Sequence, residues 1–340
     1  MSLALGLMLV APTKAPPAAA PAPNVKLTID APSQRGAWTM HVANDGDSPV
    51  RLAADARLLT LALTPRGAQK AVRCRLPADM RPAGDLDRSL VLPAKREYVE
   101  TFEPRLYCFA GKELDALGPG AIVVARLGWE GAGTSSPLEV APIDGAEPPI
   151  VPLKSIESAP VALPDEITPA FVPKASLTTD ASLDAPEGLE LVASGTVDAE
   201  SPDNASISLT LRNKSSHPFI VHFRPDSVGF EVERADGGGA ESCPWPTLRA
   251  APVRELFTTL APKTGTAELT VLLSAYCTGT ILDTGGLLVV RPWLDTSAAS
   301  GPSVGLRSFD GQVDAKSPTF VRLHRGAVAD PEARGRMQGQ

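Results

Sequence analysis

Four cysteines set at a repeated spacing constrain the fold of this chain more than any other feature. Cys74 and Cys108 lie 34 residues apart, Cys243 and Cys277 also lie 34 apart, and Cys243 follows Cys74 by 169 residues. A fixed period of this kind indicates an internal repeat. The 340 residues also suit two domains, on the usual range of about 100 to 200 residues each. We therefore expect two copies of one structural unit.

The offset of 169 residues brings other positions into register. Identical residues recur at Asn44 and Asn213, Pro49 and Pro218, Pro77 and Pro246, Pro93 and Pro262, Thr101 and Thr270, and Tyr107 and Tyr276. The segments "WTMHVANDGDSPVRL" and "ISLTLRNKSSHPFIV" share alternating apolar residues, a polar turn and a proline. A three-residue gap then aligns "LGPGAIVVARLGW" with "DTGGLLVVRPW", which pairs Trp129 with Trp293. Each copy is expected to end in a short strand, "SPLEV" from Ser136 and "SPTFV" from Ser317.

A proline-rich stretch separates the two copies. Eight prolines lie between Pro142 and Pro173 with little periodic apolar pattern, and such proline density favours a semi-extended spacer. The expected organisation is a signal-like apolar and Ala/Pro-rich leader at 1–23, a first domain at 24–143, a linker at 144–185, a second domain at 186–326 and a disordered tail at 327–340.

Short strands dominate each copy. In the second, "ASISLTLRN", "FIVHF", "VGFEVER", "TAELTVLLS" and "LLVVRPW" are separated by turn segments such as "KSSHP" and "APKTG". Regular short strands with frequent turns are typical of an antiparallel β-sandwich. Only "AGKELDAL" of the first copy has a helical pattern. The sequence therefore predicts an all-β fold of two tandem sandwiches joined by a Pro-rich linker.

Three groups of segments recur in the two copies with a recognisable pattern. "TMHVANDGDSPV" and "SLTLRNKSSHPF" contain a strand, an Asn, a polar turn and a proline; "VLPAKREYVETF" and "LAPKTGTAELTV" follow, and then "LGPGAIVVARLGW". This pattern resembles bacterial immunoglobulin-like domains. It is more loosely similar to the bacterial intracellular proteinase inhibitor family, which shares the strand, Asn-x-Ser turn and later Pro-Gly strand. The first resemblance implies immunoglobulin-like sandwiches and a binding role.

The even number of cysteines and their matched spacing favour one disulfide within each copy. We expect Cys74 to pair with Cys108 and Cys243 to pair with Cys277. Four buried free thiols or a metal site are the alternatives. A zinc site would use closely spaced pairs such as C-x-x-C, and the chain has none.

Other chemical groups give no support for catalysis or cofactor binding. Asp45 and Asp47 could approach a calcium ion, but the matching turn "NKSSHP" has no carboxylate, so the shared Asn and Pro indicate turn chemistry. The four histidines, His41, His217, His222 and His324, lack a nucleophile motif nearby and are interpreted as surface or strand residues. We expect a non-enzymatic protein without cofactor or metal.

Trp245 is the one candidate contact residue. It follows Cys243 in "CPWP", a rigid loop that could present an aromatic ring to a partner. Core or rim packing is the expectation for the other tryptophans, Trp38, Trp129 and Trp293, of which the last two end equivalent strands.

Charge and the N-terminus bear on location and partners. A formal net charge of −7 without a basic block does not favour nucleic acid. The apolar run from Leu3 to Ala11 is too short to span a bilayer but suits a secretory signal, so export is expected and a cytoplasmic location is the alternative. The expected role is a binding or spacer module at the cell envelope, its partner an unknown protein or envelope component. A proteinase inhibitor acting through the loop at Cys243 to Pro246, or an enzyme with an inter-domain site, are the rival functions.

Overall fold

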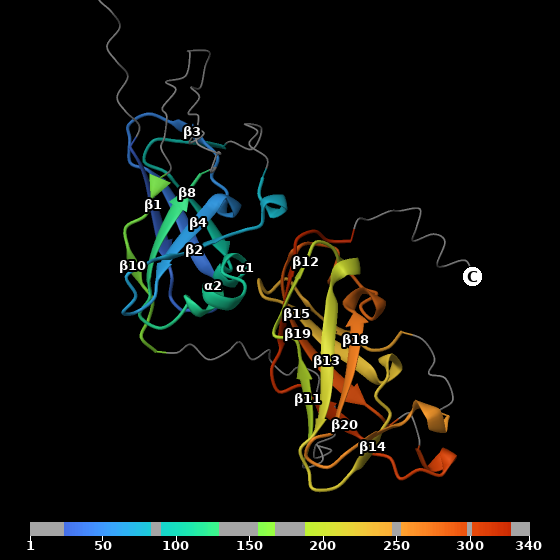
Figure 1. Cartoon of the computed structure of the whole chain (residues 1–340). Helices are drawn as coiled ribbons and strands as arrows, with labels where there is room; N and C mark the ends of the chain where they lie inside the picture. Colours follow the sequence, from blue (N-terminus) through green and yellow to red (C-terminus); the bar gives the residue numbers. More distant parts are fainter. Residues whose placement is uncertain are drawn as a thin grey trace, which may run out of the picture.

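The computed structural model describes residues 24–82, 90–128, 156–166, 188–246, 253–297 and 301–327. Two separate hydrophobic cores divide this part of the chain, one between Leu27 and Leu163 and the other between Leu189 and Leu323. Strands carry both cores, so the expected all-β class is confirmed. Figure 1 shows the two units as an N-terminal domain, blue to green, and a C-terminal domain, yellow to red.

Two sheets enclose the core of the N-terminal domain. One has the strand order β1-β2-β7; the other has the order β10-β8-β4-β5, with β9 also beside β8, and β3 pairs with β6. The strands are β1 (Val25–Asp30), β2 (Trp38–Asn44), β3 (Val50–Leu52), β4 (Leu59–Thr64), β5 (Val72–Arg75), β6 (Leu90–Leu92), β7 (Glu97–Phe102), β8 (Ile122–Leu127), β9 (Ile156–Glu157) and β10 (Val161–Ala162). The helices are short: α1 (Pro104–Tyr107), α2 (Gly111–Asp115), η1 (Ala56–Leu58) and η2 (Ala78–Met80).

The alternation of residues explains why these strands pack as two layers. On β2, Trp38, Met40 and Val42 are fully buried while the residues between them are half-exposed. Because successive side chains of a strand point to opposite faces, these three lie on one face of the sheet. They share one core with Leu61 and Leu63 of β4, from the other sheet. Each such side chain stabilises the fold by about 1.5 to 3 kcal/mol on burial.

The C-terminal domain repeats this plan. One sheet has the order β11-β13-β18, the other has the order β12-β21-β19-β15-β16 with β20 beside β19, and β14 pairs with β17. The strands are β11 (Leu189–Ala193), β12 (Thr196–Ala199), β13 (Ser206–Asn213), β14 (Phe219–Val221), β15 (Val228–Arg234), β16 (Ala240–Cys243), β17 (Thr258–Leu260), β18 (Thr266–Leu272), β19 (Gly286–Asp295), β20 (Gln312–Asp314) and β21 (Thr319–Leu323). Single 3-10 turns lie at η4 (Pro202–Asn204), η5 (Pro225–Ser227), η6 (Arg254–Leu256), η7 (Leu273–Ala275) and η8 (Gly301–Val304).

Strand register corrects one part of the repeat alignment. Thr60 pairs with Arg126, and its counterpart Gly229 pairs with Trp293. Trp293 therefore occupies the position of Arg126 and does not correspond to Trp129, which lies outside the described residues. The glycine is required for space, because a Cβ on Gly229 would lie 2.1 Å from the Trp293 ring.

The expected linker is wrong in its middle part. β9 and β10 pair with β8, as β20 and β21 pair with β19 in the other domain. Residues 156–166, expected within the linker at 144–185, thus complete the first domain, in the role expected for the run from Ser136. Ser136, the leader at 1–23 and the tail from residue 328 lie outside the described residues.

The expectation of antiparallel sheets is wrong for the pair of β12 and β21. β12 runs parallel to β21, because the chain leaves one sheet after β11 and joins the other. In the N-terminal domain β1 instead stays with β2 through Asp30. The Gln34 amide there donates to the carbonyls of Pro164 and Glu166. These two hydrogen bonds hold the segment after β10 against the chain that follows β1.

Candidate functional site

Both expected disulfides are present, Cys74–Cys108 and Cys243–Cys277. All four cysteines are buried, and none is free. The free-thiol and metal alternatives for these residues are therefore excluded. Each bridge joins the outer strand of the larger sheet, β5 or β16, to a segment that immediately follows a short helical turn. The cysteines are structural crosslinks inside the two cores.

A buried tyrosine precedes the second cysteine of each bridge. The Tyr107 hydroxyl donates to the carbonyl of Ala56 at 2.6 Å, and the Tyr276 hydroxyl donates to the carbonyl of Pro225 at 2.9 Å. Burial raises the pKa of both phenols, so they stay protonated and able to donate. The repeated Tyr-Cys pair thus fastens the crosslinked segment to the loop that leads into the central strands.

A buried asparagine anchors the turns at the opposite side of each core. The Asn44 amide donates to the carbonyls of Ser48, Leu92 and Pro93, and its side-chain oxygen accepts from the N–H of Gly46. The turn interpretation of this residue is correct, and the aspartates beside it serve the same turn: Lys95 bonds the carbonyl of Asp45 and pairs with Asp47.

Asn213 makes the same set of contacts in the C-terminal domain. Its amide donates to the carbonyls of His217, Leu260 and Ala261, and its oxygen accepts from the N–H of Ser215. Ala261 therefore takes the role of Pro93, so the match of Pro93 with Pro262 shifts by one residue. Both asparagine side chains are 1% exposed.

Trp245 lies at the margin of the second core. It is half-buried, and its ring contacts Tyr276 edge to face with centroids 5.3 Å apart. Part of its surface faces solvent, so the proposed contact role stays a prediction.

Replacing Trp245 with Ala is expected to lower the free energy of unfolding of the C-terminal domain by about 1 to 2 kcal/mol. The reason is loss of part of the apolar burial and of the aromatic pair with Tyr276. Thermal denaturation of the full chain measures this, with Trp245→Phe as the control that keeps the ring contact. An unchanged melting temperature would show that the ring does not stabilise the domain and serves only as a contact for a partner.

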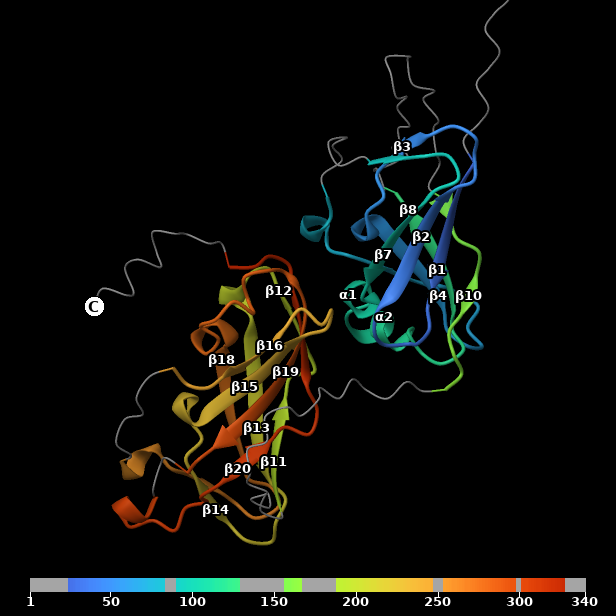
Figure 2. The same ribbon diagram turned by 180° about the vertical axis from the view of Figure 1, so that it is seen from behind.

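Polar and aromatic contacts join the two domains where α1 and Phe109, on either side of Cys108, meet β21. Arg322 on β21 donates from Nη1 to the carbonyl of Leu106 at 3.1 Å. Its guanidinium carbon lies 4.5 Å from the centre of the Phe109 ring, and that of Arg105 lies 5.2 Å from the Phe320 ring. In both views of the ribbon, α1 and α2 lie on the side of the N-terminal domain that faces the other domain (Figures 1 and 2).

Arg105 is held in place by its neighbour Glu103. Its Nε and Nη2 donate to the two carboxylate oxygens at 2.7 Å and 3.1 Å, and both side chains are buried. A bidentate pair of this kind fixes the orientation of the guanidinium. The flat face of Arg105 is thereby presented to Phe320 of the C-terminal domain.

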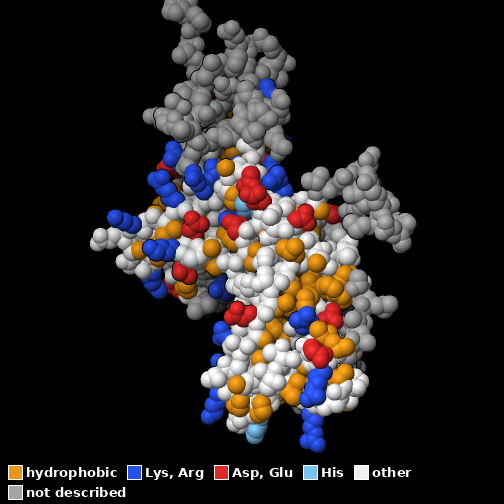
Figure 3. Space-filling model, turned by 45° about the vertical axis from the view of Figure 1, so that its right-hand side comes forward, with side chains coloured by type: hydrophobic (Ala, Val, Ile, Leu, Met, Phe, Trp, Pro, Cys, Tyr) orange, Lys and Arg blue, Asp and Glu red, His pale blue; other side chains and the backbone are white. Residues whose placement is uncertain are grey.

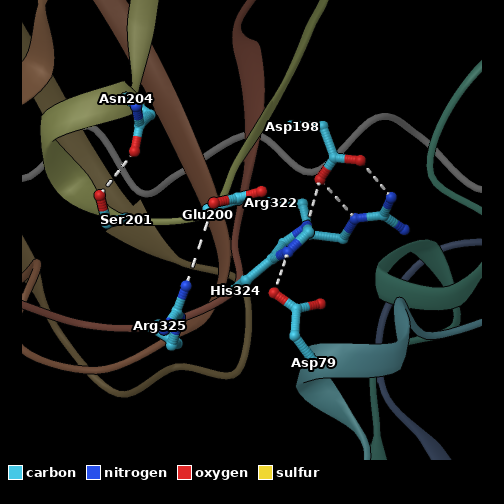
Figure 4. Close-up of polar contacts among 8 residues, drawn as sticks. All are labelled: Asp79, Asp198, Glu200, Ser201, Asn204, Arg322, His324 and Arg325. Carbon is cyan, nitrogen blue, oxygen red and sulfur yellow. Dashed lines mark hydrogen bonds and ion pairs between the residues drawn. The ribbon is translucent and has the colours of Figure 1, made fainter.

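His324, directly after β21, lies between two carboxylates from different domains (Figure 4). Its Nδ1 is 2.8 Å from Oδ2 of Asp79 in the N-terminal domain, and its Nε2 is 2.8 Å from Oδ1 of Asp198 on β12. Ionised carboxylates only accept hydrogen bonds, so both ring nitrogens must carry a proton for both contacts to form. Arg322 also donates from Nε to Asp198 at 2.8 Å. With both ring nitrogens protonated, the junction pairs two cations, Arg322 and His324, with two carboxylates.

The two aspartates respond to this environment. Burial raises the pKa of Asp198, but the hydrogen bonds from Arg322 and His324 outweigh it, so the pKa lies below its ordinary value. For Asp79, burial likewise raises the pKa and the bond from His324 outweighs it. Both groups therefore stay ionised at pH values where a free aspartate begins to take up protons.

The arrangement is suited to joining surfaces and gives no support for acid–base catalysis. A general base needs a ring nitrogen available to a substrate proton, whereas both nitrogens of His324 are engaged by carboxylates. The nearby Ser201 hydroxyl donates to Asn204, and Arg325 lies 4.0 Å from Glu200 (Figure 4). Among the described residues, no group of three or more His, Cys, Asp or Glu side chains is placed to hold a metal ion.

The sequence interpretation missed the junction. His324 was assigned to surface or strand, like His41, which pairs with Glu97, and His217, which is exposed. No motif marks Asp79 and His324, which are separated by 245 residues. The sequence offers only an indirect indication, which is that neither residue has an equivalent in the repeat. A contact between unlike faces of two copies uses different residues in each copy.

Comparisons with known proteins add little. No protein-family model matches the chain, and no curated protein matches it. Solved structures that match include the transglutaminase of red sea bream, which shows 14% sequence identity with a TM-score of 0.20; the match covers 88% of this chain and 31% of the transglutaminase chain. The chain thus spans about a third of that protein's length, and a TM-score this low carries no argument.

Acidic and basic side chains are interspersed on the face drawn in Figure 3, with apolar side chains between them. Of the helices in the described ranges, none has the length and apolar character needed to cross a bilayer.

Proposed function

We propose that the chain is a non-enzymatic, exported protein whose two immunoglobulin-like domains act as a binding or spacer module at the cell envelope. The observation that carries the proposal is the construction itself: two copies of one β-sandwich, each closed by its own buried disulfide, joined through direct side-chain contacts. Disulfides persist in oxidising compartments outside the cytosol.

Strand topology supports the immunoglobulin-like assignment. The order β11-β13-β18 faces β21-β19-β15-β16, and the first strand pair switches from one sheet to the other through β12, parallel to the last strand. Immunoglobulin-type sandwiches pack two sheets of this size with short connections at both ends. In this fold, binding residues lie on loops or sheet edges presented by a rigid frame.

Capture from an envelope fraction tests the binding role. The full chain, with its disulfides intact, is immobilised and incubated with solubilised envelope from the source organism. The proteins that it retains are compared with those retained by a second sample of the chain, which has been reduced under mild denaturant and alkylated. We expect at least one envelope component to be retained only by the oxidised chain, which depends on the folded loops. Identical retention by both forms, or by neither, would contradict a binding role.

Export is tested separately. The chain recovered from the extracytoplasmic fraction should gain the mass of four hydrogen atoms on reduction, two for each bridge. Recovery only from the cytosol, with reducible bonds absent, would contradict export. A protease panel run with the same full chain addresses the inhibitor alternative, which no observed contact favours, since Trp245 packs against Tyr276.

A further inference from the structure

The contacts at His324 differ from the remaining junction contacts because they depend on a titratable cation. Arg322 keeps its charge at all ordinary pH values, so its bonds to Leu106 and Asp198 persist. Histidine side chains in general change charge between about pH 5 and pH 8. The link between Asp79 and Asp198 through His324 therefore depends on the protonation of the imidazole, and it crosses from one domain to the other.

We propose that His324 is a pH-sensitive latch, which holds the two domains in one fixed arrangement when its imidazole is protonated and loosens that arrangement when the imidazole is neutral. In the protonated form both N–H groups donate to carboxylates, one in each domain. The neutral form has a single N–H, so one carboxylate then faces a nitrogen lone pair and loses its hydrogen bond.

The charges around His324 set the direction of the effect. Asp79 approaches from η2 and Asp198 from β12; Arg322 and Arg325 flank it on its own segment, with Glu200 paired to Arg325. Loss of the imidazolium charge leaves Asp79 facing Asp198 with only the arginines to balance them. Since carboxylates in proximity repel, domain contact weakens as pH rises through the titration of the histidine.

The acid limit follows from the aspartates. Hydrogen bonds from His324 lower the pKa of Asp79, and those from Arg322 and His324 lower the pKa of Asp198, in each case against the raising effect of burial. A carboxyl group whose pKa is lowered in the folded state stabilises that state at pH values above the ordinary pKa. This stabilisation is lost as the pH falls through the lowered pKa. The latch therefore stays closed in mild acid and opens on the alkaline side.

Distance measurements between the domains test the latch. Dyes are attached through Lys70→Cys in the N-terminal domain and Glu255→Cys in the C-terminal domain, both exposed positions; the native cysteines are all in disulfides. Single-molecule energy transfer is recorded at about pH 5.5 and about pH 8.5, on either side of the histidine range. We expect one narrow distance population at the lower pH, and a ratio of docked to open molecules about tenfold smaller at the higher pH.

Three variants complete the experiment. His324→Gln and Asp79→Asn, on opposite domains, should each give the smaller ratio of docked to open molecules at both pH values. His217→Gln, at an exposed turn, should respond to pH like the parent chain. Circular dichroism confirms that each variant is folded, and Asp79→Asn provides the test if His324→Gln is not. A parent chain with the same distribution at both pH values, or a folded His324→Gln or Asp79→Asn variant that keeps the pH response, would overturn the proposal.

Discussion

Removal of the second disulfide by Cys243→Ala with Cys277→Ala is expected to lower the free energy of unfolding of the C-terminal domain by about 3 to 4 kcal/mol. The bridge closes a loop of 34 residues, and that loop length gives about this value from the entropy lost by the crosslinked unfolded chain. The melting temperature of the domain should fall by about 10 °C. Differential scanning calorimetry of the full chain measures both.

The N-terminal bridge provides a matched comparison, because it closes a loop of the same length. Cys74→Ala with Cys108→Ala should destabilise its own domain by a similar amount. It should also loosen the junction, since Asp79 and Phe109 lie close in sequence to the two cysteines and contact the other domain. Equal interdomain distances in the two double variants would contradict this part of the expectation.

Asn213→Ala is expected to lower the free energy of unfolding of the C-terminal domain by about 3 kcal/mol. The side chain is 1% exposed and its amide donates to three carbonyls. Alanine removes these three hydrogen bonds and the acceptor of the Ser215 N–H, and an unsatisfied buried polar group costs about 1 to 3 kcal/mol. The carbonyls of His217 and Ala261 keep the bonds that they accept from the Ser215 hydroxyl and the Gly265 N–H. Some carbonyls near the surface would form hydrogen bonds to water, so the total loss of free energy of unfolding is smaller than the sum of the costs of the separate groups.

Urea denaturation of the full chain checks this value. Asn44→Ala should cost a similar amount in the other domain, because Asn44 makes the corresponding contacts. Asn204→Ala is the control: Asn204 is exposed, with one side-chain bond to Ser201, and its loss should stay within about 0.5 kcal/mol. Losses below about 1 kcal/mol for both buried asparagines would show that the turns hold without them.

Much of the fold could be predicted because its signals are local or duplicated. Alternation along β2 and β13 identifies strands with one buried face. The matched cysteine spacing predicts both disulfides. The alignment is less reliable where an identity occurs without a shared structural role: the tryptophan pair and the Pro93 match both fail, since sheet register and hydrogen bonding place other residues there.

The candidate site was not predictable in the same way. The linker expectation failed at residues 156–166 because proline density is local, whereas pairing with β8 depends on an edge formed by distant strands. Likewise, β12 is a short strand whose parallel partner lies more than a hundred residues away. Nothing in a short window of sequence reports such partners.

The sequence by itself determined the all-β class, the two-fold repeat, the cysteine pairs and the turn role of the two asparagines, because each depends on periodicity or on a residue type with one dominant structural use. Only the tertiary structure decided where the first domain ends, which strand runs parallel, and that His324 meets Asp79 across the junction. The physical reason is that a contact between the unlike faces of two similar domains depends on their relative placement, which no repeated or local pattern encodes.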